Sequence, residues 1–138
     1  MKASASDQRS ILDIQKFDFQ SATLRNKAAN LPELAEINSL TIKQNNARDL
    51  RIAAETELSD VKRELARAEG DVEQIVTRIE RDEKRLSSGT GTPKELEQTQ
   101  HELVTLGARR AELEEVELEI MMRVDAIKER IADLSGQE

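Results

Sequence analysis

Apolar residues recur along most of this chain at alternating spacings of three and four, in two runs separated by the segment Ser88 to Pro93. A period of about 3.5 residues, kept over many heptads, is typical of helices that wind around each other in a left-handed supercoil. Because a glycine-rich turn lies between the runs, the pattern predicts a long antiparallel coiled-coil hairpin. The heptad positions of the first run are Ile37, Leu40, Gln44, Ala47, Arg51, Ala54, Leu58, Val61, Leu65, Ala68, Val72, Ile75, Ile79, Asp82 and Leu86. Those of the second run are Leu96, Thr99, Leu103, Leu106, Arg110, Leu113, Glu117, Ile120, Val124, Ile127, Ile131 and Leu134.

Capping signals divide the chain into three helices, over about residues 5–30, 32–87 and 93–135. Ser4 or Ser6 can cap the first helix, and Pro32 interrupts the pattern and suits the first turn of the second helix. Gly89 suits the left-handed residue that commonly follows a helix end. Thr92 and Glu95 have the spacing of a capping box, which places the start of the third helix at Pro93.

The shorter N-terminal helix has an apolar face of its own, which predicts that it folds back on the second helix. That face consists of Ile14, Phe17, Leu24, Ala28 and Leu31. The apolar surface of the longer helices also widens at the end remote from the turn, at Ile42, Leu50, Ile52, Ala53, Met121, Met122 and Ala126. We therefore expect an all-α fold with a three-helix base and a two-helix tip, forming one elongated domain over residues 1–138.

Charged residues beside the seam predict how the two long helices are aligned. Pairing Leu65 with Leu113 brings opposite charges together, whereas a slide by one heptad sets Arg78 beside Arg109. Exposed ion pairs contribute only about 0–1 kcal/mol each, so they select a register more than they stabilise it. The first alignment is the predicted register, and its ion pairs are Arg85–Glu95, Arg78–Glu102, Asp71–Arg109, Glu57–Arg123 and Lys62–Glu114.

Composition supports a rod rather than a globule with an enclosed pocket, since 36% of residues are charged and the only aromatics are Phe17 and Phe19. The absence of cysteine excludes disulfides, thiolate nucleophiles and cysteine-ligated metal within these residues. No apolar run has the length of a membrane span or an export signal, so we expect a cytoplasmic protein with no membrane partner. A formal net charge of −7 disfavours tight binding to a polyanion.

Two features could carry chemistry, but each has a simpler structural explanation. The acidic run of Glu112, Glu114, Glu115, Glu117 and Glu119 offers too few converging oxygens for Ca²⁺, so we interpret it as a solvated helix face. His101 has no second histidine or cysteine near it and lies outside the seam, which is typical of a surface histidine. We predict no catalytic residue, no metal site and no cofactor in this chain, and no enzyme activity.

Two glycines lie inside the long helices. Gly70 and Gly107 each cost about 1 kcal/mol relative to alanine in a helix interior. They are therefore candidates for a bend or for a close backbone contact.

Basic residues gather around the turn although the chain is acidic overall. They are Arg78, Arg81, Lys84, Arg85 and Lys94. Their positive charge complements the dipole at the end of the second helix, and it could also contact an acidic protein or a nucleic-acid backbone. No aromatic residue lies among them to stack on a base. These five residues form the candidate contact site of the hairpin.

The segments Ser88 to Leu103 and Leu113 to Met121, with the arm Ala54 to Val72, resemble a bacterial family of zinc-ribbon proteins, most closely its actinobacterial branch. Members join an N-terminal coiled-coil hairpin to a C-terminal ribbon whose four cysteines bind zinc. The resemblance implies a cytoplasmic regulator or adaptor that contacts nucleic acid through the ribbon. For flagellated or type III secreting members of the family, it implies a connection with RNA, a sigma factor or secretion machinery. This sequence has no cysteine. The ribbon, and with it the zinc, is therefore expected beyond residue 138, which suggests a shortened piece of a longer protein.

Three functions remain open from the sequence. The first is a non-catalytic scaffold or adaptor region of such a regulator, with a protein partner. The second is direct nucleic-acid binding by the basic residues of the tip. The third is a hairpin chaperone or self-assembling rod, a homo-oligomer that uses the apolar side chains beside the seam, which are Val76, Val104, Val116 and Leu118.

Overall fold

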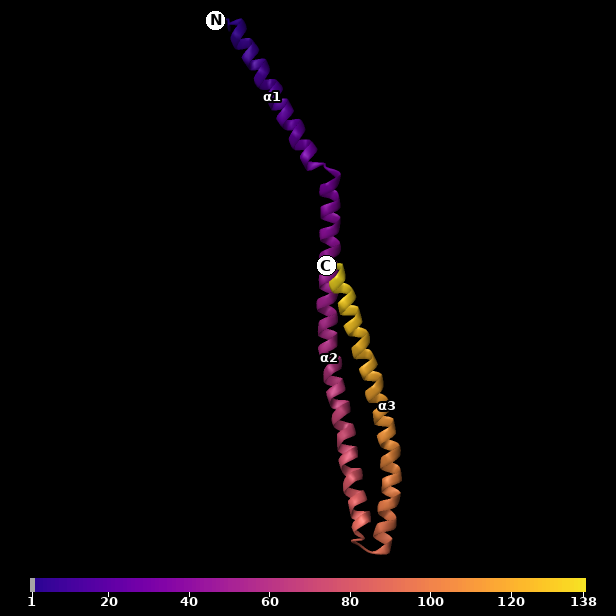
Figure 1. The fold of residues 1–138 in the computed structure, drawn as a ribbon. Helices are drawn as coiled ribbons and strands as arrows, with labels where there is room; N and C mark the ends of the chain where they lie inside the picture. The colour runs from indigo at the N-terminus through magenta and orange to yellow at the C-terminus, as the bar shows by residue number, and fades with distance from the viewer. Residues whose placement is uncertain (1) are drawn as a thin grey trace. The chain divides into compact units, whose positions relative to one another are not determined.

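The structure is a computed structural model that describes residues 2–138. It consists of three helices, α1 (Ala5–Ala29), α2 (Pro32–Ser88) and α3 (Pro93–Gln137), and residues 2–138 contain no strand (Figure 1). Each helix begins and ends within two residues of its predicted boundary. The predicted all-α coiled-coil hairpin is confirmed.

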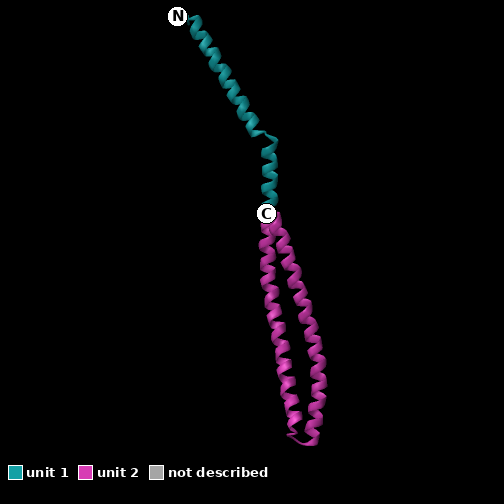
Figure 2. Cartoon of the chain, in the orientation of Figure 1, with its two compact units in different colours: residues 1–46 teal, residues 47–138 magenta. Residues whose placement is uncertain are grey.

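The chain divides into two compact units (Figure 2). The first ends at Asn46, and the second, which contains the hairpin, extends from Ala47 to Glu138. The boundary falls inside α2, where the heptad pattern has no interruption. Periodicity alone predicts one domain over the whole chain, because it records which residues share a helix face and not whether that face is covered.

In the hairpin unit, α2 and α3 lie side by side and antiparallel, joined by a short turn (Figure 1). Two helices can enclose only a narrow strip between them, so burial is confined to the heptad positions. The main core cluster contains Val61, Ala68, Ile120, Val124 and Ile127, against which Leu58, Leu65 and Ile131 pack. This seam is the hydrophobic core of the unit.

Both predicted N-caps are present. The Ser4 hydroxyl accepts from the Asp7 backbone N–H, and the Asp7 carboxylate accepts in return from the Ser4 backbone N–H, which forms a capping box at α1. At α3, Thr92 and Glu95 form the second box around Pro93. Each box satisfies two backbone N–H groups that have no partner inside the helix.

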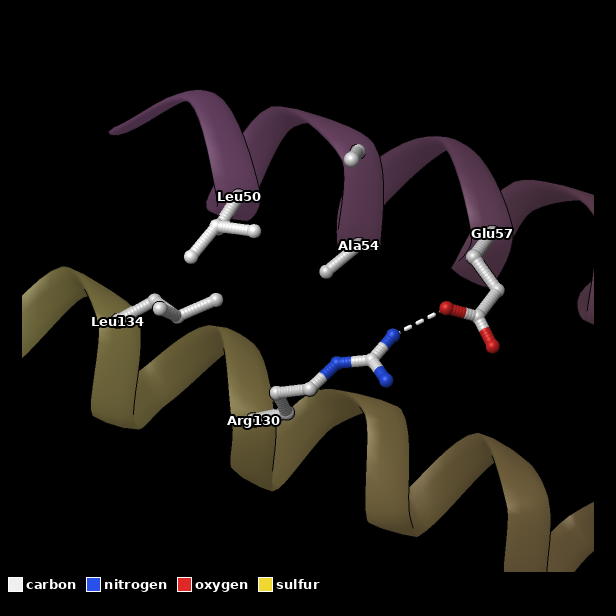
Figure 3. Close-up of a pocket in the computed structure, with 6 residues that line it drawn as sticks. Leu50, Ala54, Glu57, Arg130 and Leu134 are labelled. Carbon is white, nitrogen blue, oxygen red and sulfur yellow. Dashed lines mark hydrogen bonds and ion pairs between the residues drawn. The ribbon is translucent and has the colours of Figure 1, made fainter. Parts of the chain in front are cut away.

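The register in the half of the hairpin away from the turn differs from the predicted one by a heptad. Glu57 forms an ion pair with Arg130, one heptad beyond the predicted partner Arg123 (Figure 3). Arg123 instead lies 2.8 Å from Glu64. The predicted pair Arg78–Glu102 does occur nearer the turn, at 3.9 Å.

Apolar burial explains why the predicted register is wrong in the half of the hairpin away from the turn. That register places the Val61 side chain opposite Glu117, whereas the structure places Val61 in one cluster with Ile120 and Val124. Burying an aliphatic side chain stabilises the folded state by about 1.5–3 kcal/mol, which is more than an exposed ion pair contributes. A shift by one heptad was expected to bring like charges together, such as Arg78 and Arg109. Acidic residues of α3 itself compensate these arginines, because Arg109 binds Glu112 at 2.9 Å and Arg110 binds Glu114 at 2.7 Å.

In the unit that ends at Asn46, the apolar face predicted for α1 is uncovered. Every described residue up to Asn46 is exposed, and α1 buries none of its side chains. The predicted three-helix base would join residues of both units and stays a prediction. Leu12 and Phe19 lie on a different side of the helix from the predicted stripe through Ile14 and Phe17. A helix whose apolar residues are divided between two sides cannot bury both against one neighbour.

Of the two alternatives raised for Gly70 and Gly107, a bend or a close backbone contact, the close contact is not found. A Cβ atom added at either position would meet no atom within 4 Å. Both residues lie within uninterrupted helix.

Engineered cysteines test the register, because the chain has no cysteine of its own. The double variant Val61→Cys with Val124→Cys should form a disulfide on oxidation, since the two side chains share the core cluster. Ala54→Cys with Val124→Cys, which face each other in the register predicted from charge, should stay reduced. Mass spectrometry after mild oxidation distinguishes the two outcomes, and a disulfide in only the second variant would restore the charge-based register.

Candidate functional site

The tip of the hairpin is formed by the last turns of α2, the turn itself and the first turns of α3 (Figure 1). Lys84 and Arg85 lie in the last turns of α2, and Lys94 lies in the first turn of α3. Arg81 and Arg78 follow at one-turn intervals back along α2. The fold thus gathers the five predicted basic residues at one end of the hairpin unit.

Two glycines shape the turn. Gly89 and Gly91 have positive φ angles of 63° and 130°, which residues with a Cβ rarely adopt. A Cβ at Gly91 would also lie 3.0 Å from the Glu95 Oε2. The Ser88 hydroxyl donates to the Arg85 carbonyl at 2.9 Å and lies 2.6 Å from the Thr90 hydroxyl, so local hydrogen bonds hold the turn.

The Glu95 carboxylate is the best-defined charged group of the tip. Its Oε2 accepts a 2.8 Å hydrogen bond from the Thr92 backbone N–H. This bond, followed by the Thr92 side-chain bond and the nearby positive charge of Arg85, lowers the pKa of Glu95 below its ordinary value of 4.5. The same carboxylate therefore caps α3 and partly neutralises Arg85.

Three of the five basic residues have an acidic neighbour. Arg78 faces Glu102, the Arg81 Nε lies 3.6 Å from the Asp82 Oδ1, and Arg85 is near Glu95. Lys84 and Lys94 form no ion pair with any residue that the structure describes. Between Arg78 and Glu102 the sequence has five basic and six acidic side chains. The tip therefore presents mixed charge rather than a uniformly basic surface.

Asp82 occupies a seam position and is buried, with only 6% of its surface exposed. Within residues 2–138, its Oδ2 has no hydrogen-bond partner. The buried Thr99 on α3 satisfies its own hydroxyl by donating to the Glu95 carbonyl at 2.9 Å. A heptad pattern reveals Asp82 as a polar seam residue, but it does not reveal that one oxygen stays unpaired.

The other candidates remain surface features. In the acidic run, Glu112 and Glu114 form ion pairs with arginines of their own helix. No group of three or more histidine or acidic side chains in residues 2–138 is arranged to hold a metal ion. His101 is exposed and borders a shallow depression with Arg78 and Glu102. Nor does any helix of this range have an apolar stretch long enough for a bilayer.

Two further surfaces could contact other molecules. A shallow groove near the open end of the hairpin is lined by Leu50, Ala54, Glu57, Arg130 and Leu134, and the Glu57–Arg130 ion pair closes one side of it (Figure 3). Of the four apolar side chains predicted beside the seam, Val76 on α2 is half-buried and three on α3 are exposed. The three exposed residues are Val104, Val116 and Leu118.

The paired helices, the capped turn and the apolar seam agree with what sequence comparison finds. The CT398-like coiled coil hairpin domain matches residues 14–138. The chain belongs to this family of coiled-coil hairpins. Two uncharacterized proteins of Mycobacterium tuberculosis, Rv2229c of strain H37Rv and MT2288 of strain CDC 1551, are each 34% identical to it over 132 residues, or 93% of this chain. No solved structure matches the chain.

The chain spans about half the length of these relatives, since the alignment covers 52% of each. A zinc ribbon requires four cysteine ligands, and this chain has no cysteine and a single histidine. The residues present therefore do not fit a structural zinc site.

Replacing Asp82 should stabilise the hairpin. In Asp82→Leu, an unpaired buried oxygen is exchanged for apolar surface, so the free energy of unfolding should rise by about 1–3 kcal/mol. Asp71→Leu, at an exposed position of α2, is the matched control and should change little. Urea denaturation followed by circular dichroism measures both variants, and a loss of stability in Asp82→Leu would mean that the carboxylate has a stabilising partner.

The Glu95 cap should make the stability of the tip depend on pH. Because the folded-state pKa lies below 4.5, the carboxylate stabilises the native state above that pH, and the contribution is lost as pH falls through the folded value. Glu95→Gln should therefore melt at a lower temperature than wild type at neutral pH, and the difference should shrink on acidification. Glu97→Gln, which makes the same change outside the capping box, should show no such convergence.

Proposed function

We propose that this hairpin is a non-catalytic scaffold that holds a protein partner at a fixed distance in the cytoplasm. The observation that carries the proposal is the uninterrupted pairing of α2 with α3 in the hairpin unit. A helix of 45 residues such as α3 is about 65 Å long, so the tip and the open end of the unit are widely separated. A spacer of this kind acts through its length and stiffness.

Stiffness follows from how the seam is built. Successive layers of Ala54, Val61 and Ala68 are buried along α2, so bending would expose apolar surface at several levels together. Ion pairs between the helices flank this strip, at Glu57–Arg130 and Glu64–Arg123. Neither helix has a break between its ends.

The charges of the tip favour a protein partner over a polyanion. Lys84 and Lys94 can each donate to a carboxylate, while the neighbouring acidic side chains can bind basic groups of the same partner. Non-specific nucleic-acid affinity comes mainly from many Lys and Arg contacts with phosphates, and here most of the arginines already have acidic neighbours. Direct binding of nucleic acid by Arg78, Arg81, Lys84, Arg85 and Lys94 is the second candidate, supported by their convergence at the turn.

The scaffold role is proposed for a protein longer than this hairpin. The mycobacterial relatives extend well beyond the aligned region. We propose that a zinc ribbon, implied by the resemblance of the turn and the acidic stretch to the ribbon family, supplies the regulatory contacts, including any with nucleic acid. The hairpin then sets the distance between those contacts and the partner at the tip.

Site-specific photo-crosslinking in the native cells tests the scaffold role. A photoreactive residue at position 94, in the tip, should give a discrete protein adduct that disappears when Arg81→Glu and Arg85→Glu are introduced together. The same residue at position 119, on the acidic face of α3, is the matched control and should give none. Adducts of similar yield from both positions would contradict tip docking and favour a rod that grips clients along its edges.

Fluorescence anisotropy with a labelled single-stranded RNA and a DNA duplex tests the second candidate. At physiological salt we expect dissociation constants weaker than about 10⁻⁴ M, the weak end of non-specific binding. Tighter binding that falls steeply with salt and is lost in the Arg81→Glu, Arg85→Glu variant would favour a nucleic-acid tip over a protein-docking tip.

A further inference from the structure

The turn between α2 and α3 carries two hydroxyl groups that lie outside the helices. Only residues 89–92 separate the two helices, and Thr90 and Thr92 are the threonines among them. Every other serine and threonine of the hairpin unit lies within α2 or α3. Thr90 is exposed and lies between Gly89 and Gly91, so neither neighbour has a side chain to shield it. Exposed loop tips of this kind are where an enzyme gains access to a folded chain.

We propose that Thr90 is a phosphorylation site for a protein kinase that uses ATP. The inference goes beyond the scaffold role and does not depend on it. Three features of the turn support it, which are the access to Thr90, the hydrogen bonding of its hydroxyl group and the positive charge of the residues around it.

The hydroxyl group of Thr90 is free to act as a nucleophile. It lies 2.6 Å from the Ser88 hydroxyl, and Ser88 already donates its proton to the Arg85 carbonyl. Because a hydroxyl has one proton to donate, Thr90 is the donor in its contact with Ser88. No group that the structure describes donates to the Thr90 oxygen, so the lone pairs of that oxygen are available for attack.

The other hydroxyl groups beside the turn are less suited to accept a phosphate. Ser87 and Ser88 belong to α2, and they donate to helix carbonyls at 3.0 and 2.9 Å. The Thr92 oxygen accepts from the Glu95 backbone N–H as the cap of α3. A phosphate on Thr92 would also lie against the Glu95 carboxylate, and these like charges repel each other. Modification of Thr90 leaves both the end of α2 and the capping box in place.

In the reaction, the Thr90 oxygen attacks the terminal phosphorus of ATP. A bond forms between Oγ1 and that phosphorus while the bond from the phosphorus to the bridging oxygen breaks, and ADP leaves with the electron pair. The hydroxyl proton passes to a base of the kinase. The product side chain carries a charge of about −2 at neutral pH.

The residues around Thr90 can compensate that negative charge. From Lys84 to Lys94 the chain has three basic side chains, including Arg85, and no acidic one. Lys84 and Lys94 form no ion pair with any residue that the structure describes, so a phosphate can bind them without displacing a partner. A phosphate of about −2 reduces the charge of this segment from +3 to about +1. Phosphorylation therefore weakens the attraction of the turn for acidic groups.

Transfer of labelled phosphate tests the site. The purified chain, incubated with radiolabelled ATP and an extract of the native cells, should become labelled, and Thr90→Ala should lose most of that label. Thr90→Ser keeps the hydroxyl group and should retain the label. Thr105→Ala, which removes an exposed hydroxyl within α3, is the matched control and should be labelled like the wild type. Circular dichroism checks that all variants are equally helical.

Mass spectrometry of the protein isolated from the native cells locates the phosphate. We expect it on Thr90. A wild-type chain that takes up no label, a label that survives Thr90→Ala, or a phosphate found on Ser87, Ser88 or Thr92 in place of Thr90 would overturn the proposal.

Phosphorus NMR tests the charge compensation separately, on a chain with phosphothreonine incorporated at position 90. The second ionisation of a phosphate monoester has an ordinary pKa of about 6. Lys84 and Lys94 should lower that pKa, because nearby cations favour the dianion. Lys84→Gln with Lys94→Gln should therefore raise the pKa, whereas Lys62→Gln with Lys128→Gln, far from the turn along both helices, should leave it unchanged. Equal pKa values with and without Lys84 and Lys94 would contradict compensation by these lysines.

Discussion

Burial of one apolar strip between α2 and α3 is the interaction on which the hairpin depends. Val61, Ile120 and Val124 lie in its main cluster, and they hold the register although opposite charges favour another alignment. The ion pairs Glu57–Arg130 and Glu64–Arg123 form in the register that this cluster sets. Because the strip is only as wide as a heptad seam, no enclosed pocket can form beneath it, and any contact with another molecule must use the outer surface or an end.

Polar residues on the strip have different local solutions. Arg51 reaches out of the seam to Glu55 and Glu138, at 2.7 and 3.0 Å, so its charge is compensated at the open end of the hairpin. Asp82 lies deeper and keeps one oxygen unpaired near the turn. The seam is therefore most apolar in the middle of the hairpin, and apolar packing stabilises it less towards the tip. The tip is the region that we propose contacts a partner.

The helix ends could be predicted from the sequence because capping is local. Ser4, Thr92 and Pro93 act within one turn of the chain, so a pattern of four residues is enough to recognise them. The register could not be obtained from charge, since long exposed side chains such as Arg109 find other partners on their own helix. The exposure of α1 could not be predicted either, because an apolar stripe through Phe17 does not show whether another surface is available to cover it. The five tip residues could be placed together from the sequence, but the proximity of Glu102 to Arg78 and of Glu95 to Arg85 required coordinates.

The distance of the main apolar cluster from the turn has a consequence for how the hairpin folds. A hairpin that zips from its turn forms its nearest contacts first, at little entropic cost. Here the layers closest to the turn include Asp82 and Thr99, whereas Val61 and Val124 meet across a loop of about sixty residues. Closing that loop costs more entropy than closing the turn, and the main apolar cluster lies in those remote layers. The rate-limiting barrier to folding should therefore come late, after both helices have formed and paired over most of the distance from the turn to the open end.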